Sequence, residues 1–269
     1  MALEQQQGGE PKARVGLIIP SVNTFSEPQF NRFAPEGLGI HIARARVAGE
    51  WKRPLPELKD EIATASKLLS DVKPNAIVFH CTDTSMTQGP QGEGKILDIV
   101  QDATGIPAMA TSRLVLEALQ KLGMKKVVLL TPYKSNKAVI DYLTASGIEV
   151  VRDIAMKLEP LAFGSVTPAQ WATMSKEIDG PDVDGVFLSC TNTTQIDAIE
   201  NIDAERALPM LADLGGQCLA GRDAGSEPGE LRDGVRVGVG EHRRIERRHA
   251  VEDRRLMRLE RVEDGHRRR

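Results

Sequence analysis

Two cysteines of this sequence stand in nearly the same local sequence. Residues 76–85 are AIVFHCTDTS and residues 185–194 are GVFLSCTNTT, so Cys81 and Cys190 each follow a short apolar run and one spacer residue. A cysteine thiolate is a strong nucleophile and a competent base, and its pKa responds to nearby donors and charges. Two thiols that face one carbon atom from opposite sides suit two-base racemisation, or cis–trans isomerisation through a covalent adduct. The alternative is that both are buried structural thiols, but the duplicated local sequence favours a catalytic role for them.

Small polar residues follow each thiol, and they suit the binding of carboxylates. Thr82 and Asp83 follow Cys81, while Thr191 and Asn192 follow Cys190. Hydroxyl groups and loop N–H groups can hold a carboxylate and can stabilise the charge of an enolate-like intermediate.

The elements that must position the thiols are strands. A short run rich in Val, Ile and Phe is typical of a buried strand in a parallel sheet, and small polar residues after it indicate a strand-to-helix loop. Ligands of open α/β sheets lie just outside the carboxyl ends of the strands. Both thiols are therefore expected at the carboxyl ends of strands, where such a fold binds its ligands.

The rest of the chain alternates between strand and helix patterns, which predicts a mostly parallel sheet. Strands are expected over 14–20, 39–47, up to Cys81, 106–110, 126–131, 148–154, up to Cys190 and 208–211. Helices are expected over 58–72, 96–103, 112–122, around 139–147, over 168–178 and from about 195.

The pattern restarts near residue 125, which predicts an α/β protein of two similar Rossmann-like domains. Their parallel sheets would be related by a pseudo-twofold axis, with the active site in the cleft between them. We expect a first half over 13–112, a second half over 113–206, and a segment, 207–220, that returns to complete the first half.

Composition narrows the possible partners and the compartment. The chain has 269 residues, 41% of them hydrophobic, and a formal net charge of −3. This charge predicts no nucleic-acid partner. No run approaches the roughly 18 apolar residues that span a membrane, and the N-terminus lacks a signal-peptide pattern, so we expect a cytoplasmic protein without membrane contact. The three cysteines have no spacing that predicts a zinc site or a disulfide framework. The sequence is compatible with a homo-oligomer but predicts no particular oligomeric state.

The segment 221–269 breaks the alternation of strands and helices. It contains no aromatic residue and no Lys, but it is rich in Arg. Three interpretations are a solvated Arg/Glu-rich helix over about 241–263, a nucleic-acid-binding arm, which the interleaved acidic residues disfavour, and a frameshifted, non-native tail. No function is assigned to this segment, and Cys218 just before it is not taken as a ligand.

Four ordered motifs resemble the aspartate/glutamate racemase superfamily. They are VGLIIPSVNT at residues 15–24, Cys81-Thr82, LTPY at 130–133 and LSC at 188–190, and the resemblance spans about 14–211. The branch that these motifs resemble holds maleate cis–trans isomerase and arylmalonate decarboxylase. The resemblance implies two α/β domains that enclose a small dicarboxylic acid, with no metal and no organic cofactor.

The resemblance also implies roles for the two thiols. Cys81 is similar to the nucleophile of maleate isomerase, and Cys190 to its second cysteine. The decarboxylase branch has Gly at the first position and keeps only the second cysteine as proton donor, so the presence of both favours an isomerase or racemase. The alternatives are an arylmalonate-type decarboxylase that uses Cys190, and a catalytically dead protein that binds small carboxylates.

Further residues correspond to the substrate pocket of this family. Asn23 is similar to the asparagine that holds a carboxylate, although a loop Asx-turn would explain it too. The remaining candidates are Pro20, Ser21, Thr82, Asp83, Tyr133, Thr191 and Asn192. Asp83 differs from the small neutral residue of the pattern; when ionised it would oppose a dianion unless it points away or meets a cation. His80 is expected to pack, because neighbours along a strand face opposite sides.

Overall fold

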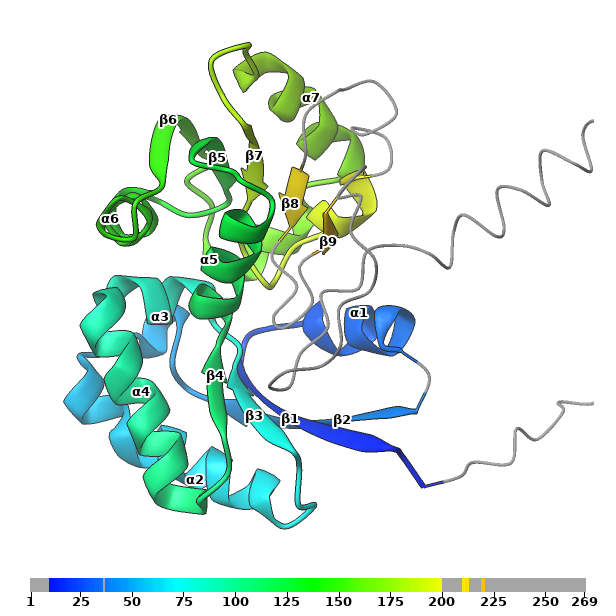
Figure 1. Ribbon diagram of the computed structural model, residues 1–269, viewed down its shortest axis with the longest axis vertical. Helices are drawn as coiled ribbons and strands as arrows, with labels where there is room; N and C mark the ends of the chain where they lie inside the picture. Colours follow the sequence, from blue (N-terminus) through cyan, green and yellow to red (C-terminus); the bar gives the residue numbers. More distant parts are fainter. Residues whose placement is uncertain (1–9, 36, 200–209, 213–218, 221–269) are drawn as a thin grey trace, which may run out of the picture. The chain divides into compact units, whose positions relative to one another are not determined.

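Two β-sheets organise the part of the chain that the structure describes (Figure 1). The structure is a computed structural model, and it describes residues 10–35, 37–199, 210–212 and 219–220. All of these residues belong to one compact unit. The predictions for residues 200–209, for Cys218 and for 221–269 lie outside the described residues.

The first half contains a four-stranded sheet in the order β2-β1-β3-β4, in which every pair of neighbours is parallel. Its elements are β1 (Ala13–Pro20), α1 (Ser26–Phe33), β2 (Leu38–Ala45), η1 (Gly49–Trp51), α2 (Leu55–Ser70), β3 (Ala76–Phe79), α3 (Thr82–Thr87), α4 (Gly89–Thr104) and β4 (Ala108–Ala110).

The second half contains a five-stranded sheet in the order β6-β5-β7-β8-β9. Its elements are α5 (Thr111–Lys121), β5 (Lys126–Thr131), α6 (Lys137–Ala145), β6 (Glu149–Ala155), η2 (Pro160–Ser165), α7 (Pro168–Ile178), β7 (Gly185–Leu188), η3 (Gln195–Ala198), β8 (Met210–Ala212) and β9 (Leu219–Ala220). Only the β8–β9 pair is antiparallel among the described strands.

The two sheets repeat one strand order, because β2-β1-β3-β4 corresponds to β6-β5-β7-β8. The prediction of two similar α/β halves with parallel sheets is thereby confirmed. The expected return of the last strand to the first half is wrong for the described part, since β8 pairs in parallel with β7, from Val186–Met210 to Leu188–Ala212. An apolar strand pattern predicts a sheet position but does not name the neighbour.

Local chemistry explains most helix ends. Gly123 and Gly147 follow α5 and α6 with φ values of +70° and +81°, a conformation that glycine adopts without a Cβ clash. Thr167 caps α7 in a reciprocal capping box with Gln170. Two differences lie after Cys81: residues 82–87 form a short helix instead of a loop, and α4 begins at Gly89, seven residues before the expected start. In addition, α1 was not predicted, and the helix expected from about residue 195 begins as the 3₁₀ helix η3.

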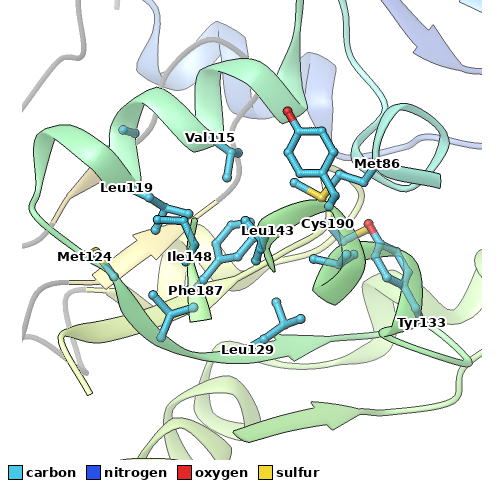
Figure 2. Packing of buried hydrophobic residues seen from close by; sticks show 14 residues of the cluster. Met86, Val115, Leu119, Met124, Leu129, Tyr133, Leu143, Ile148, Phe187 and Cys190 are labelled. Carbon is cyan, nitrogen blue, oxygen red and sulfur yellow. The ribbon is translucent and has the colours of Figure 1, made fainter. Parts of the chain in front are cut away.

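Four main hydrophobic clusters fill the space around the sheets. Alternate residues of β1 serve opposite faces: Ile18 packs with α2 and α4, while Leu17 and Ile19 pack with Phe30 of α1. This arrangement places α1 and α2 on opposite faces of the first sheet (Figure 1). In the second half, one cluster joins α5 and α6 to the sheet (Figure 2), and another joins α7.

A buried carboxylate connects helices of both halves. Glu93 of α4 is fully buried and accepts hydrogen bonds from Tyr142 Oη of α6 at 2.6 Å and from Ser112 Oγ of α5. Arg113 Nε donates to its other oxygen at 2.9 Å. Burial and the hydrogen bond to Glu93 raise the pKa of Tyr142, so the phenol remains the donor that this carboxylate requires.

No helix among the described residues is both long and apolar enough to cross a lipid bilayer.

Candidate active site

Cys81 and Cys190 line the same cavity, which has a volume of about 1130 Å³. Each thiol lies two residues beyond a fully buried strand, β3 in the first half and β7 in the second. Both cysteines are buried, and each is only 4% exposed to solvent. The repeat in the sequence therefore brings two sheltered thiols to the wall of one cavity, at the carboxyl ends of equivalent strands.

The Cys81 thiol is held by Thr84, at the start of α3. Cys81 Sγ donates to Thr84 Oγ1 at 3.1 Å, because the Thr84 hydroxyl donates its own proton to the carbonyl of Val47 at 2.8 Å. This direction is the one that suits a protonated thiol. When a thiolate forms, Thr84 can turn its hydroxyl proton to the sulfur and release the Val47 carbonyl.

Burial, followed by the charge of Asp83, raises the pKa of Cys81 to about 11, although Thr84 and Lys52 act in the opposite direction. At neutral pH the thiol form of Cys81 therefore predominates. A group that neutralises Asp83 or adds positive charge to the cavity makes the thiolate easier to form.

Asp83 meets a cation, which is one of the two conditions under which it would not oppose a dianionic ligand. Its Oδ2 accepts from Lys52 Nζ at 2.8 Å, and the ammonium also donates to Thr87 Oγ1 at 3.0 Å. The two charged side chains are 35% and 30% exposed, and both residues line the cavity. The carboxylate that departs from the family pattern is thus half of an ion pair.

Cys190 has a different environment. The backbone N–H of Asn192 points to its sulfur, with N and Sγ 3.4 Å apart. The carbonyl of Cys190 accepts from Thr193 Oγ1 at 3.3 Å and from Gln195 Nε2 at 2.5 Å. Its φ of +152° is a backbone conformation that L-residues rarely adopt. Such strain persists where surrounding contacts enforce it and is frequent at functional sites.

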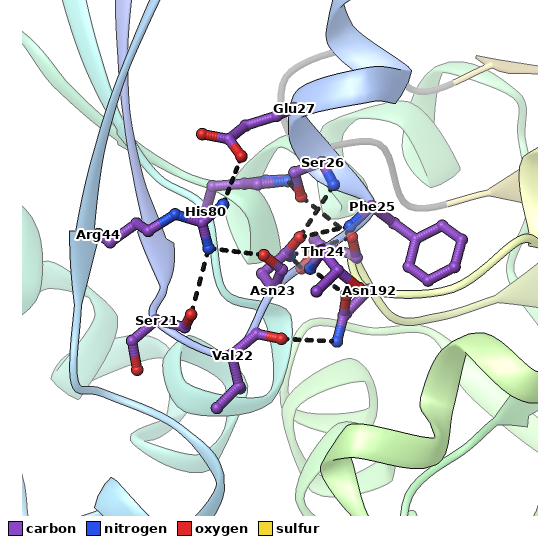
Figure 3. Close-up of polar contacts among 11 residues, drawn as sticks. Ser21, Val22, Asn23, Thr24, Phe25, Ser26, Glu27, Arg44, His80 and Asn192 are labelled. Carbon is purple, nitrogen blue, oxygen red and sulfur yellow. Dashed lines mark hydrogen bonds and ion pairs between the residues drawn. The ribbon is translucent and has the colours of Figure 1, made fainter.

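The loop after β1 joins the two halves at the cavity (Figure 3). The side-chain oxygen of Asn23 accepts from the N–H groups of Phe25 and Ser26 at 3.1 and 2.9 Å. This is the Asx-turn that the sequence allowed. The amide of Asn23 donates to the Thr191 carbonyl at 3.2 Å, and the residue lines the cavity. Asn23 therefore shapes its own loop and at the same time faces the cavity.

The loop after β7 is fastened to the same segment by neutral hydrogen bonds. Asn192 Oδ1 accepts from the N–H of Thr24 at 2.8 Å, and its amide donates to the Val22 carbonyl at 3.4 Å (Figure 3). Gln29 Nε2 donates to the Thr193 carbonyl at 2.7 Å. These contacts hold the Cys190 loop against the first half.

His80, the residue before Cys81, is fully buried among neutral partners. Its Nε2 lies 2.8 Å from Ser26 Oγ, whose proton goes to the Thr191 carbonyl at 3.0 Å, so Nε2 carries the ring proton. Its Nδ1 accepts from Thr111 Oγ1 at 3.0 Å. Burial lowers the pKa of His80 to about 3, so the ring stays neutral. It connects β3 to α1 and α5, as the packing interpretation expects.

The remaining candidates divide into those that line the cavity and one that does not. Pro20, Thr82 and Tyr133 line it, together with Thr191 and Asn192. Tyr133 is 6% exposed and packs against Phe163 with ring centroids 5.7 Å apart. Ser21 is absent from the described cavity wall; its carbonyl accepts from Arg44 Nη1 at 3.2 Å.

Sequence reasoning missed Lys52 and the role of Thr84. Lys52 lies between η1 and α2, outside every motif, so no local pattern predicts that it meets Asp83. Thr84 belongs to the repeated cysteine segment, and its position three residues after Cys81 would have indicated the hydrogen bond if a helical turn had been expected there.

Comparisons with known proteins agree with this geometry. The model of the family described as arylmalonate decarboxylase matches residues 15–225, and the chain belongs to this family. The resemblance inferred from the four motifs is confirmed.

Named relatives fall in both branches. A maleate isomerase of Geobacillus stearothermophilus is 27% identical over 216 residues, which cover 74% of this chain and 86% of the relative. An arylmalonate decarboxylase of Bordetella bronchiseptica is 26% identical over 165 residues, 59% of this chain and 63% of the relative.

Solved structures share the fold. A Nocardia farcinica maleate cis-trans isomerase with a covalently bound succinylcysteine intermediate has a TM-score of 0.68 and 20% identity, and the match covers 75% of this chain and 88% of that chain. A crystal structure of arylmalonate decarboxylase has a TM-score of 0.64 and 18% identity, with coverage of 75% and 87%.

Proposed function

We propose that this protein is a cofactor-independent, cysteine-dependent cis–trans isomerase of a small dicarboxylic acid, with maleate as its first substrate. The observation that carries the proposal is that Cys81 and Cys190 line a single cavity from equivalent positions of the two halves. The relatives named maleate isomerase support the same reaction.

In the proposed reaction the Cys81 thiolate adds to one alkene carbon of maleate. A carbon–sulfur bond forms, and the electron pair of the double bond moves to the adjacent carbon and its carboxylate. The former double bond is now single, so the adduct can rotate about it. Cys190 donates a proton to the carbanionic carbon and takes it back before Cys81 leaves. Loss of the Cys81 thiolate restores the double bond in the trans arrangement, which is fumarate.

Neutral donors around the cavity suit the two carboxylates of such a substrate. We assign Asn23, Thr82 and Tyr133 to carboxylate binding, with Thr191 and Asn192 as the corresponding groups beside Cys190. All five residues line the cavity. A carboxylate held by fixed donors needs no reorganisation when negative charge develops beside it, which is the basis of electrostatic stabilisation of an intermediate.

The test is the conversion of maleate to fumarate by the purified protein, followed by proton NMR. We expect conversion that is lost after treatment with iodoacetamide, with untreated protein and protein-free maleate as controls. Protein that melts cooperatively and leaves maleate unchanged would contradict the proposal. Release of carbon dioxide from a disubstituted malonate by the same sample would then favour decarboxylation with Cys190 as proton donor. Thermal stabilisation by carboxylates without turnover of either substrate would favour a non-catalytic binding protein.

A further inference from the structure

The charged residues on the cavity wall offer a dianionic substrate few ammonium groups to bind. The described wall contains three lysines, and each pairs with an acidic residue: Lys52 with Asp83, Lys134 with Glu159 and Lys137 with Asp141. Glu50 adds another acidic side chain. Acidic residues therefore outnumber lysines on this wall, and a dicarboxylate gains from any ammonium that can still donate.

The Lys52–Asp83 pair is less exposed to solvent than the other two ion pairs. Its side chains are 35% and 30% exposed, whereas those of the other pairs are between 61% and 79% exposed. Contacts with well-solvated charges contribute little to binding, because water and salt screen them. Lys52 is thus the lysine of this wall whose charge acts most strongly on a bound ligand.

The geometry leaves the ammonium of Lys52 able to donate once more. It has three N–H donors, and the described residues provide two acceptors, Asp83 Oδ2 and Thr87 Oγ1. Thr87 gives its own proton to the carbonyl of Asp83 at 2.6 Å, so its hydroxyl can only accept from Lys52. Both partners belong to α3, which starts directly after Cys81, and Lys52 lines the same cavity as that thiol.

We propose that Lys52 is a substrate-binding and specificity-determining residue, which donates its third N–H to the carboxylate next to the carbon that Cys81 attacks. The proposal deepens the proposed function and rests on it for the identity of the substrate. Asp83 positions the ammonium but also repels the dianion. Lys52 thereby favours ligands with two carboxylates over ligands in which one carboxylate has become an amide, and the charge of Asp83 opposes part of this preference.

The test is binding of succinate, a saturated dicarboxylate that cannot be isomerised, measured by calorimetry. Because a hydrogen bond from a charged donor is lost, Lys52→Met is expected to raise the Kd of succinate about tenfold to a hundredfold. The matched control is Lys126→Met, which also removes one lysine from an ion pair, here with Glu149 at 3.8 Å and away from the cavity. This control is expected to bind succinate as the unaltered protein does.

Succinamate, the monoamide, separates a lost contact from a disturbed structure. The unaltered protein should prefer succinate to succinamate, and Lys52→Met should lose most of that preference. The proposal is overturned if Lys52→Met binds succinate like the unaltered protein or keeps its full preference over the monoamide. An equal loss in the Lys126 control would overturn it as well.

A second variant keeps the test valid if Lys52→Met does not melt cooperatively. Asp83→Asn removes the repulsive charge but keeps a side-chain oxygen that can accept from Lys52 Nζ and so hold the ammonium in place. This variant should lower the Kd of succinate severalfold; weaker binding would overturn the proposal. Failure of the unaltered protein to bind succinate would also overturn it. Succinate binding without maleate turnover would refute the proposed isomerase alone, and the Lys52 comparison would still be decided by binding.

Discussion

The two cysteine loops have nearly the same sequence but different surroundings. After Cys81 the chain enters helix α3, and Asp83 and Thr87 hold the charged side chain of Lys52. After Cys190 the chain forms turns and then the short 3₁₀ helix η3, and the polar side chain of Asn192 makes neutral hydrogen bonds to backbone groups of the first half. The residues one position before each thiol differ as well. The His80 ring has two hydrogen-bond partners, whereas Ser189 Oγ is buried without a hydrogen-bond partner among the described residues.

This difference shows how a repeated segment can provide two unequal thiols. The Cys81 thiol resists ionisation because burial and the charge of Asp83 outweigh the opposite effects of Thr84 and Lys52. The Cys190 sulfur instead accepts from the backbone N–H of Asn192 and has no carboxylate as the next-but-one residue. The repeat in sequence supplies equivalent positions, and the neighbours of each position decide its chemistry.

The largest expected effect comes from replacing either cysteine sulfur, the nucleophile of Cys81 or the proton donor of Cys190. Cys81→Ser and Cys190→Ser should each lower the rate of maleate isomerisation by at least about a thousandfold, because nucleophilic addition and proton transfer are both required. The rates are measured by NMR, and circular dichroism checks that both variants fold. A decarboxylase would respond differently: only the Cys190 variant would be inactive.

Alkylation would compare the two thiols directly. A pKa of about 11 for Cys81 lies two units above that of an ordinary thiol, so its thiolate is about a hundredfold scarcer at pH 7 to 8. In the Cys190→Ser variant, iodoacetamide should therefore modify Cys81 about a hundredfold more slowly than an exposed cysteine, with a rate that rises tenfold per pH unit up to pH 10. A plateau near pH 8 would contradict this environment. Asp83→Asn should speed the modification.

The histidine beside Cys81 should make the fold sensitive to acid. The pKa of His80 is about 3 in the folded protein and about 6.5 in the unfolded chain. The unfolded chain binds the additional proton between these values, so the contribution to stability is present above pH 6.5 and is lost as the pH falls towards 3. His80 alone should lower the free energy of unfolding by about 1.4 kcal/mol per pH unit in this window. Urea unfolding across this range measures the slope.

The control for this measurement is His80→Gln, which cannot titrate. Its unfolding free energy should fall less steeply with acidification, by the equivalent of about one proton. Equal slopes in the two proteins would show that His80 does not titrate on unfolding as its burial requires.

The smallest expected effect concerns the residues two positions after each thiol. Asn192→Ala leaves the N–H of Thr24 without its partner and should cost about 1 to 3 kcal/mol of stability. Asp83→Ala breaks a partly exposed ion pair and should cost about 0 to 1 kcal/mol. Thermal or urea unfolding of both variants makes the comparison. A larger cost at Asp83 than at Asn192 would reverse the contrast between the two loops.

Much of this fold was predictable because each half repeats a simple pattern. The strand at 126–131 and the helix at 168–178 have the predicted bounds, since a buried apolar run and a Thr-Pro start are strong local signals. The cavity positions of Cys81, Cys190 and Asn23 followed from the repeat and from the family motifs.

What escaped prediction depends on contacts between distant segments. The neighbour of β8 is chosen by sheet packing, which an apolar run of three or four residues does not encode. Lys52 meets Asp83 across 31 positions, and Ser21 turns its carbonyl to Arg44 although its loop lies beside the cavity. Charge and polarity are visible in a sequence, but the partner of a single polar side chain is not.

The buried carboxylate of Glu93 limits how freely this architecture can be recombined. Its donors come from α5 and α6, whereas its own helix packs with the first half. A chimaera that joined a first half from one relative to a second half from another would have to preserve this donor set, because a buried charge without partners is strongly destabilising. The two halves therefore have to be kept together as a matched pair, although their sequences still display the repeat.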